Sequence, residues 1–276
     1  MDTVARVIGL WLLLMAAGYV LGVPLGLIYG LISTAISKLL RFWNDHELGP
    51  KKRGAREVDE GSVATLLHEL SQRAKIPTPR LYVIDSPYAN ASATGRNYRH
   101  SSICVTTGLL YGLGRDELAG VLSHELAHVL QRSTLTKTIA ATLSAAISLL
   151  PFVGLFVGLG IDRSVLLLFI APTAAFLIQL AISRASEYAA DECGARLSGR
   201  PDALASALRI ASTDDAEFGD PANNPIAKAL LTFGKRFVGP RRDNPFSAYP
   251  LPMNRIAALE RLSRGRDTDN PASGEL

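Results

Sequence analysis

The chain has 276 residues, of which 48% are hydrophobic, and its mean hydropathy is +0.18. This length allows one catalytic domain, and the hydropathy indicates a membrane component and argues against an ordinary soluble enzyme. The net charge of +4 does not require a nucleic-acid partner, because many basic residues between 38 and 56 directly follow an apolar run, as at the flank of a membrane span.

The N-terminal segment, residues 1–42, is expected to be a membrane anchor. Residues 7–37 are almost continuously apolar, and this run is longer than the roughly 20 residues that one span requires. A cleaved signal peptide is the alternative, but its apolar region would be only about 7–15 residues long. The glycines and proline at 22–26 could turn or kink the chain, so one or two spans remain open.

Residues 43–137 are expected to form the first half of the catalytic domain. Residues 43–56 are polar and basic and are interpreted as a linker, and residues 61–75 have the apolar spacing of a helix. Runs of β-forming residues then predict three strands, at 80–85, 88–95 and 101–106. The pattern predicts an α+β fold that is mainly helical, with a small antiparallel or mixed sheet.

The sequence His124-Glu125-Leu126-Ala127-His128 places two imidazoles four residues apart with a carboxylate beside the first. An apolar stripe of helical period surrounds the motif, and acidic residues at 116 and 117 suit a first helical turn. On a helix, positions i and i+4 share a face, so both histidines can bind one zinc ion while Glu125 stands beside it.

A zinc site of this kind needs a third protein ligand on another element. Glu187 and Asp191 lie four residues apart on a predicted helix. Glu187 would complete a His2Glu site, and Asp191 would orient a ligand imidazole by accepting its second N–H. An exposed charged helix face is the alternative for these two residues alone.

Residues 138–182 are expected to form a transmembrane helical hairpin inserted between the metal ligands. Two apolar runs, 138–161 and 165–182, are separated by the polar residues 162–164, which are predicted to form its tip. An even number of crossings keeps His124 and Glu187 on one side of the bilayer. The flanking Lys137 and Arg184 place that side in the cytoplasm, although burial inside a soluble fold is the alternative.

The second half of the catalytic domain is expected at residues 183–264, with helices at 202–212, 226–237 and 253–264, followed by a disordered tail at 265–276. Cys104 and Cys193 have no motif partner and are expected to remain thiols. His46, His68 and His100 lack ligand spacing, so structural roles are expected for them.

Three segments together resemble HtpX-type membrane zinc endopeptidases of the gluzincin group, and the resemblance covers most of residues 60–264. These segments are VTTGLLYGLGRDELAGVLSHELAH at 105–128, TIAATLSAAIS at 138–148 and SRASEYAAD at 183–191. The resemblance implies one Zn2+ per chain held by His124, His128 and Glu187, with Glu125 as catalytic base. Asp191 would support the first ligand.

The same resemblance implies roles for two further pairs of residues. Asn90 and Ala91 match an edge strand along the substrate cleft, where small side chains would let a peptide pair as an added strand; a plain hairpin strand is the alternative. Relatives often carry His-Pro six residues before Arg-Ile, but this chain has Tyr249-Pro250 before Arg255. Tyr249 and Arg255 are therefore candidate transition-state stabilisers, or structural residues.

The predicted function is an integral-membrane, zinc-dependent endopeptidase of the cell membrane, multi-pass, with its catalytic side in the cytoplasm. Its expected partners are the lipid bilayer and protein or peptide substrates, and the resemblance implies membrane-protein or misfolded-protein quality control. A catalytically silent adaptor or scaffold and a prenyl-protein-processing protease are the alternatives. The sequence does not predict an oligomeric state.

Overall fold

The computed structural model describes residues 54–87, 89–148, 161–213 and 252–269. The predicted N-terminal anchor, the predicted helix at 226–237 and Tyr249 lie outside these residues. The chain divides into two compact units, which are considered separately. The described parts of one unit are residues 138–148 and 161–179. The other unit contains the described residues up to 137 and from 180 onward.

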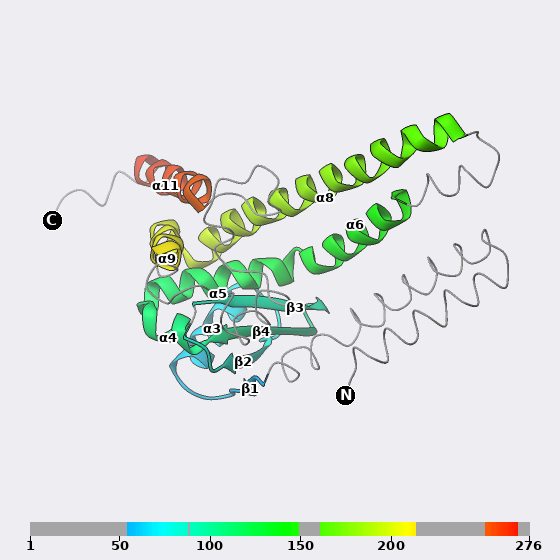
Figure 1. The fold of residues 1–276 in the computed structure, drawn as a ribbon. Coiled ribbons are helices and arrows are strands. Elements are labelled where there is room, and N and C mark those ends of the chain that lie inside the picture. Colours follow the sequence, from blue (N-terminus) through cyan, green and yellow to red (C-terminus); the bar gives the residue numbers. More distant parts are fainter. Residues whose placement is uncertain (1–53, 88, 149–160, 214–251, 270–276) are drawn as a thin grey trace. The chain divides into compact units, whose positions relative to one another are not determined.

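The sheet has four strands in the order β1-β2-β4-β3 (Figure 1), formed by β1 (Arg56–Glu57), β2 (Arg80–Ile84), β3 (Ala91–Asn97) and β4 (His100–Thr106). Strands β2 and β4 are parallel, and the other two pairs are antiparallel, so the prediction of a small mixed sheet is confirmed. The linker prediction missed β1, because a two-residue strand of charged side chains has no apolar alternation. Strand β3 lies at one edge of the sheet.

Helix α5 (Arg115–Leu130) lies along the sheet and carries the histidine motif. Its first turn contains the expected acidic residues, and Glu117 accepts a hydrogen bond from the Gly114 N–H at 2.8 Å. The helix is buried on most sides, because strand β3, helix α3 (Ser62–Arg73) and helix α9 (Pro201–Thr213) all contact it. Short helix α4 (Thr107–Gly112) precedes it.

Helix α9 packs on α5, and helix α11 (Pro252–Asp269) packs on α9 (Figure 1). A close approach at Gly120 positions α9, since a Cβ there would lie 3.0 Å from the Cα of Leu204. The expectation of a disordered tail from residue 265 is wrong for its first five residues, because α11 continues through Asp269. Once a helix is formed, each added residue gains a hydrogen bond, so polar composition alone does not end it.

Helix α6 (Ser133–Ile147) contains the first predicted apolar run as far as Ile147, and helix α8 (Ile161–Ser198) contains the whole of the second run. The prediction that residues 162–164 form a turn is wrong, because they belong to the first turn of α8, where an acidic residue is favourable. In the first unit, the Ser144 hydroxyl donates to the carbonyl of Ala175 at 3.1 Å, so the two helices lie side by side there. The connection between them lies outside the described residues.

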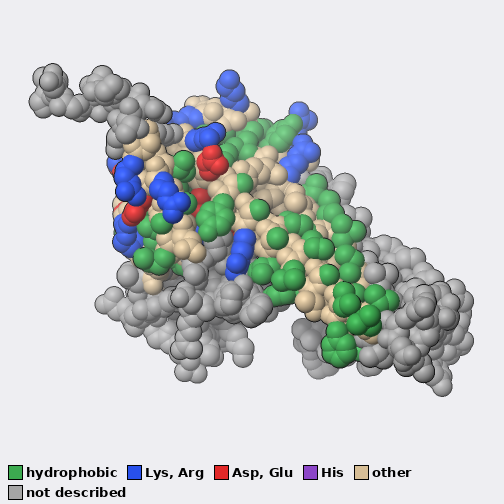
Figure 2. Space-filling view, turned by 90° about the horizontal axis from the view of Figure 1, so that it is seen from above, with side chains coloured by type: hydrophobic (Ala, Val, Ile, Leu, Met, Phe, Trp, Pro, Cys, Tyr) green, Lys and Arg blue, Asp and Glu red, His purple; other side chains and the backbone are tan. Residues whose placement is uncertain are grey.

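One helix in the described part of the chain, α8 over Leu166–Ser198, is long and apolar enough to cross a membrane. Its large apolar side chains are exposed and are visible as a hydrophobic surface in Figure 2. They include Leu166, Leu168, Phe169, Ile170, Phe176, Leu177 and Ile178. Within residues 166–178, the buried positions are held by the small residues Ala171 and Ala175, so the large apolar side chains of this part face outward.

Candidate metal centre

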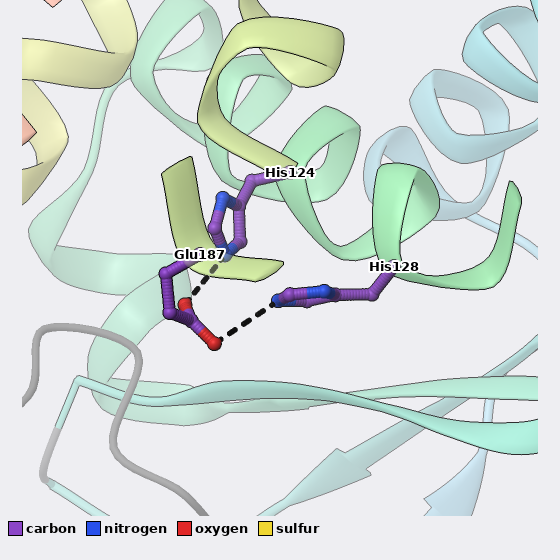
Figure 3. Close-up of side chains that lie close together, drawn as sticks. All are labelled: His124, His128 and Glu187. Atoms are coloured by element: carbon purple, nitrogen blue, oxygen red, sulfur yellow. Dashed lines mark ion pairs between the residues drawn. The ribbon is translucent and has the colours of Figure 1, made fainter. Parts of the chain in front are cut away.

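Helix α5 holds His124 and His128 one turn apart on the same face (Figure 3). Their ring centroids lie 4.7 Å apart in an edge-to-face arrangement. The His124 side chain is 1% exposed and that of His128 is 11% exposed. Surrounding packing therefore fixes both rings on a regular helix, as the spacing predicts.

Glu187 approaches the two histidines from α8 and completes the cluster (Figure 3). Its Oε2 is 3.6 Å from Nε2 of His124, and its Oε1 is 3.6 Å from Nε2 of His128. The ligand atoms of all three residues lie within 4.8 Å of one another, the one such group among the described residues. The donor set of two imidazoles and one carboxylate fits zinc, whose bonds to these atoms are about 2.0–2.2 Å long.

A glycine allows α8 to approach α5 at this point. A Cβ on Gly194 would lie 2.8 Å from the backbone nitrogen of His124 and 2.9 Å from its Cα. Such distances are too short for any side chain, so only glycine permits this helix spacing. Gly194 is seven residues after Glu187 and three after Asp191, and it therefore brings both carboxylates into reach of His124.

Asp191 and Arg255 form a buried pair behind His124. The Nδ1 of His124 donates to Oδ1 of Asp191 at 2.9 Å, which leaves Nε2 directed to Glu187. Arg255 binds Asp191 through Nε at 2.7 Å and Nη2 at 2.6 Å. Burial alone would raise the pKa of Asp191, but the Arg255 guanidinium holds that pKa below its usual range.

The model of peptidase family M48 matches residues 57–263 of the chain. The chain belongs to peptidase family M48. Members of this family are metallopeptidases, and the His124, His128 and Glu187 cluster provides the donor set for a metal. The matched residues also include Gly194, Asp191 and the strands β2, β3 and β4.

The fold of this M48 chain is also similar to the crystal structure of S. mikatae Ste24p, with a TM-score of 0.61 and 19% sequence identity. The match covers 93% of this chain but 62% of that one, so the M48 chain spans less than two thirds of the Ste24p length. At this level of identity the likeness concerns the fold. It supports the arrangement of helices around the small sheet.

The second histidine of the M48 cluster is oriented by Ser133, which sequence reasoning missed. The Ser133 hydroxyl donates to the carbonyl of His128 at 3.1 Å, and its oxygen lies 2.8 Å from Nδ1 of the same histidine. Because the hydroxyl proton is used on the carbonyl, Nδ1 is the donor in the second contact. The lone pair of His128 is thus on Nε2, the nitrogen that faces Glu187.

Lys137 is a second residue of the cluster that the sequence did not indicate, because its position beside an apolar run suggested a membrane flank. Its Nζ lies 2.9 Å from Oε1 of Glu187. The side chains of Lys137 and Glu187 are 14% and 5% exposed. An ordinary surface ion pair is more exposed than this, so Lys137 belongs to the metal centre of the M48 chain.

Glu125 lies between the metal cluster and strand β3. Its side chain is buried, and the backbone of Ala93 hydrogen-bonds to its carboxylate. Burial raises the pKa of Glu125, and the nearby negative charge of Glu187 acts in the same direction. A carboxylate with a raised pKa holds a proton more readily, as a general base near neutral pH requires.

Strand β3 presents one line of backbone groups away from the sheet. The N–H of Thr106 donates to the carbonyl of Asn90 at 3.1 Å, so the backbone groups of Asn90 face β4. Because these groups alternate along a strand, those of Ala91 and Ala93 face the outer edge, on which Glu125 lies. Of the two residues predicted for the cleft strand, Ala91 therefore lies on the same edge as the candidate base, two residues before Ala93, whereas the backbone groups of Asn90 face β4.

The other described residues considered in the sequence analysis do not form part of the metal-ligand cluster. Arg255 is fully buried against Asp191, which favours a supporting role over contact with substrate. His68 bonds Thr78 and Gln72, and His100 bonds Asn97, all away from the metal cluster. Cys104 and Cys193 are both free cysteines.

Proposed function

We propose that this M48 peptidase is an integral-membrane, zinc-dependent endopeptidase. The observation that carries the proposal is the position of Glu125: it adjoins two imidazoles and a carboxylate on one side and β3, an edge strand of the described sheet, on the other. A metal and a peptide could therefore both reach the same carboxylate. A silent adaptor would have no need of this arrangement.

His124, His128 and Glu187 would hold the metal, and a bound zinc ion would supply a Lewis acid that polarises the scissile carbonyl and acidifies water. Glu125 accepts the proton of the attacking water and can return it to the leaving amine. Asp191 and Ser133 keep the proton of each ligand imidazole on Nδ1. These hydrogen bonds direct both Nε2 atoms to the metal.

The substrate would bind as an extended segment along the outer edge of β3. Ala91 and the carbonyl of Ala93 offer backbone groups on that edge, and the small side chains of both residues allow close approach. This pairing would bring a peptide bond near Glu125, which is hydrogen-bonded to the backbone of Ala93. The family resemblance suggests membrane proteins or misfolded proteins as substrates.

The membrane assignment rests on the exposed apolar surface of α8. We infer that α6 and α8 extend into a hairpin of two spans and that the catalytic side faces the cytoplasm. The ligands His124 and Glu187 precede and follow this hairpin, so an even number of crossings is required. Reporter fusions after residue 56 and at the C-terminus should both give cytoplasmic signals, and signals from opposite sides would exclude this topology.

Two purified variants test the catalytic proposal. Glu125→Gln keeps the size of the side chain but cannot accept a proton, so casein cleavage should fall by ~10²–10⁴-fold while the zinc content stays near one per chain. Glu187→Ala removes a ligand and should lose zinc and cleavage together. Wild-type protein that binds no zinc, or a Glu125→Gln variant with full activity, would show that the proposal is wrong.

A further inference from the structure

Two cations flank the Glu187 carboxylate, one on each oxygen. Arg255 Nη1 lies 3.9 Å from Oε2, and Lys137 Nζ lies 2.9 Å from Oε1. Arg255 has an acidic partner of its own, since two of its nitrogens bind Asp191. In the part of the chain that the structure describes, Lys137 forms its ion pair with Glu187.

This arrangement changes the charge that the candidate ligands present to a metal. Arg255 offsets Asp191, and Lys137 offsets Glu187, while His124 and His128 bind metal in their neutral forms. The ligand set with its immediate partners is therefore neutral. Without Lys137, it would carry the full negative charge of one carboxylate at a position that is 5% exposed.

The geometry of the ion pair also places the amine close to the metal position. Oε1 of Glu187 is shared between Lys137 at 2.9 Å and Nε2 of His128 at 3.6 Å. The positive charge of Lys137 also acts on Glu125 and His128. A fixed cation at this distance repels a dication and makes the carboxylate a weaker donor, and poor solvent exposure limits the screening of both effects.

We propose that Lys137 sets the metal affinity of this centre by neutralising Glu187, and that it weakens metal binding. Its charge makes a His2Glu ligand set resemble a set of three neutral ligands. It also holds the Glu187 carboxylate in place when no metal is bound, when three buried carboxylates would otherwise lie close together. The inference rests on the proposed zinc centre and deepens it by assigning a residue that controls the metal affinity.

The test is the dissociation constant of zinc, measured for the full-length chain in detergent by competition with a chromophoric chelator at fixed pH. Lys137→Met keeps the apolar stem but removes the charge, and it should bind zinc about 10- to 100-fold more tightly than wild type. Lys137→Arg keeps the charge and should remain closer to wild type than to Lys137→Met. Lys75→Met removes the same charge from an exposed residue and should leave the affinity unchanged.

A second measurement separates affinity from folding. With zinc removed by chelator, Lys137→Met should melt at a lower temperature than wild type, because the buried Glu187 loses the closer of its two cationic partners. Lys137→Gln serves as the neutral variant if Lys137→Met does not fold. Zinc binding by the neutral variant that is equal to or weaker than wild type would overturn the inference. Failure of wild type to bind zinc would overturn the proposed function as well.

Discussion

The backbone of His124 lies directly against Gly194, so close that a Cβ on the glycine would be 2.9 Å from the histidine Cα. This contact determines the separation of α5 and α8, and hence the distance between the first histidine and the carboxylates of α8. The distances between the candidate ligands therefore depend on a residue that has no side chain.

Gly194→Ala should weaken zinc binding by at least about tenfold, because α8 must move away from α5 and carry Glu187 with it. Chelator competition measures the affinity, and thermal unfolding measures stability. Gly265→Ala is the matched control, since a Cβ at this helical glycine meets nothing within 4 Å. A Gly194→Ala variant with unchanged zinc affinity would show that the ligand distances tolerate a shift of the helix.

Zinc affinity should rise with pH up to about pH 9. Burial lowers the pKa of His124, but hydrogen bonds to Asp191 and Glu187 outweigh this effect and raise it to about 9 when no metal is bound. The metal requires the neutral ring, so binding below that pH releases one proton, and the affinity should change by about tenfold per pH unit. Isothermal titration in buffers of different ionisation enthalpy measures the proton release directly.

The same pKa predicts how the metal-free protein responds to pH. A pKa raised in the folded state stabilises the fold below the unfolded value of about 6.5, and this contribution is lost as pH rises through about 9. Asp191→Asn should reduce both the proton release and this pH dependence, because it removes one partner of the charged ring. An unchanged slope in Asp191→Asn would assign the proton to another group.

Ala91→Pro tests the substrate edge of β3. The N–H at this position faces away from β4, so proline removes a donor from the outer edge while the pairing of β3 with β4 is retained. KM for an unfolded protein substrate should rise by roughly tenfold, as expected for a lost backbone contact, with normal zinc content. Ala91→Ser retains the N–H and serves as control. If both variants cleave equally well, substrate binds elsewhere.

The local parts of the candidate centre could be predicted from sequence, because helical periodicity alone brings His124 and His128 together and aligns Glu187 with Asp191. The prediction that these two pairs meet required the histidine motif to be combined with a second motif about 60 residues further along the chain. Gly194 left a signal, since a glycine inside a helix costs stability unless close packing requires it. Gly194 marks the point where α5 and α8 meet.

Ser133 and Lys137 could not be found in the same way. Both depend on the short break between α5 and α6, where Arg132 adopts a positive φ of 51° although it is not glycine. This conformation is uncommon for arginine and is not visible in the sequence. Strand β1 and the continuation of α11 were missed for another reason, since pairing with β2 and helix propagation depend on neighbours more than on composition.

The composition of β3 has a consequence for substrate choice. Residues 91–95 are Ala, Ser, Ala, Thr and Gly, and the outer edge presents main-chain groups with very little side chain. Nearly every residue of a polypeptide carries the same backbone N–H and C=O groups, so an edge that binds the backbone alone would discriminate poorly between substrate sequences. It would instead discriminate between conformations, because a helix or a paired strand has no free amides to offer. Cleavage would then depend on how often a substrate segment opens locally, and a stable protein would be spared in proportion to its stability.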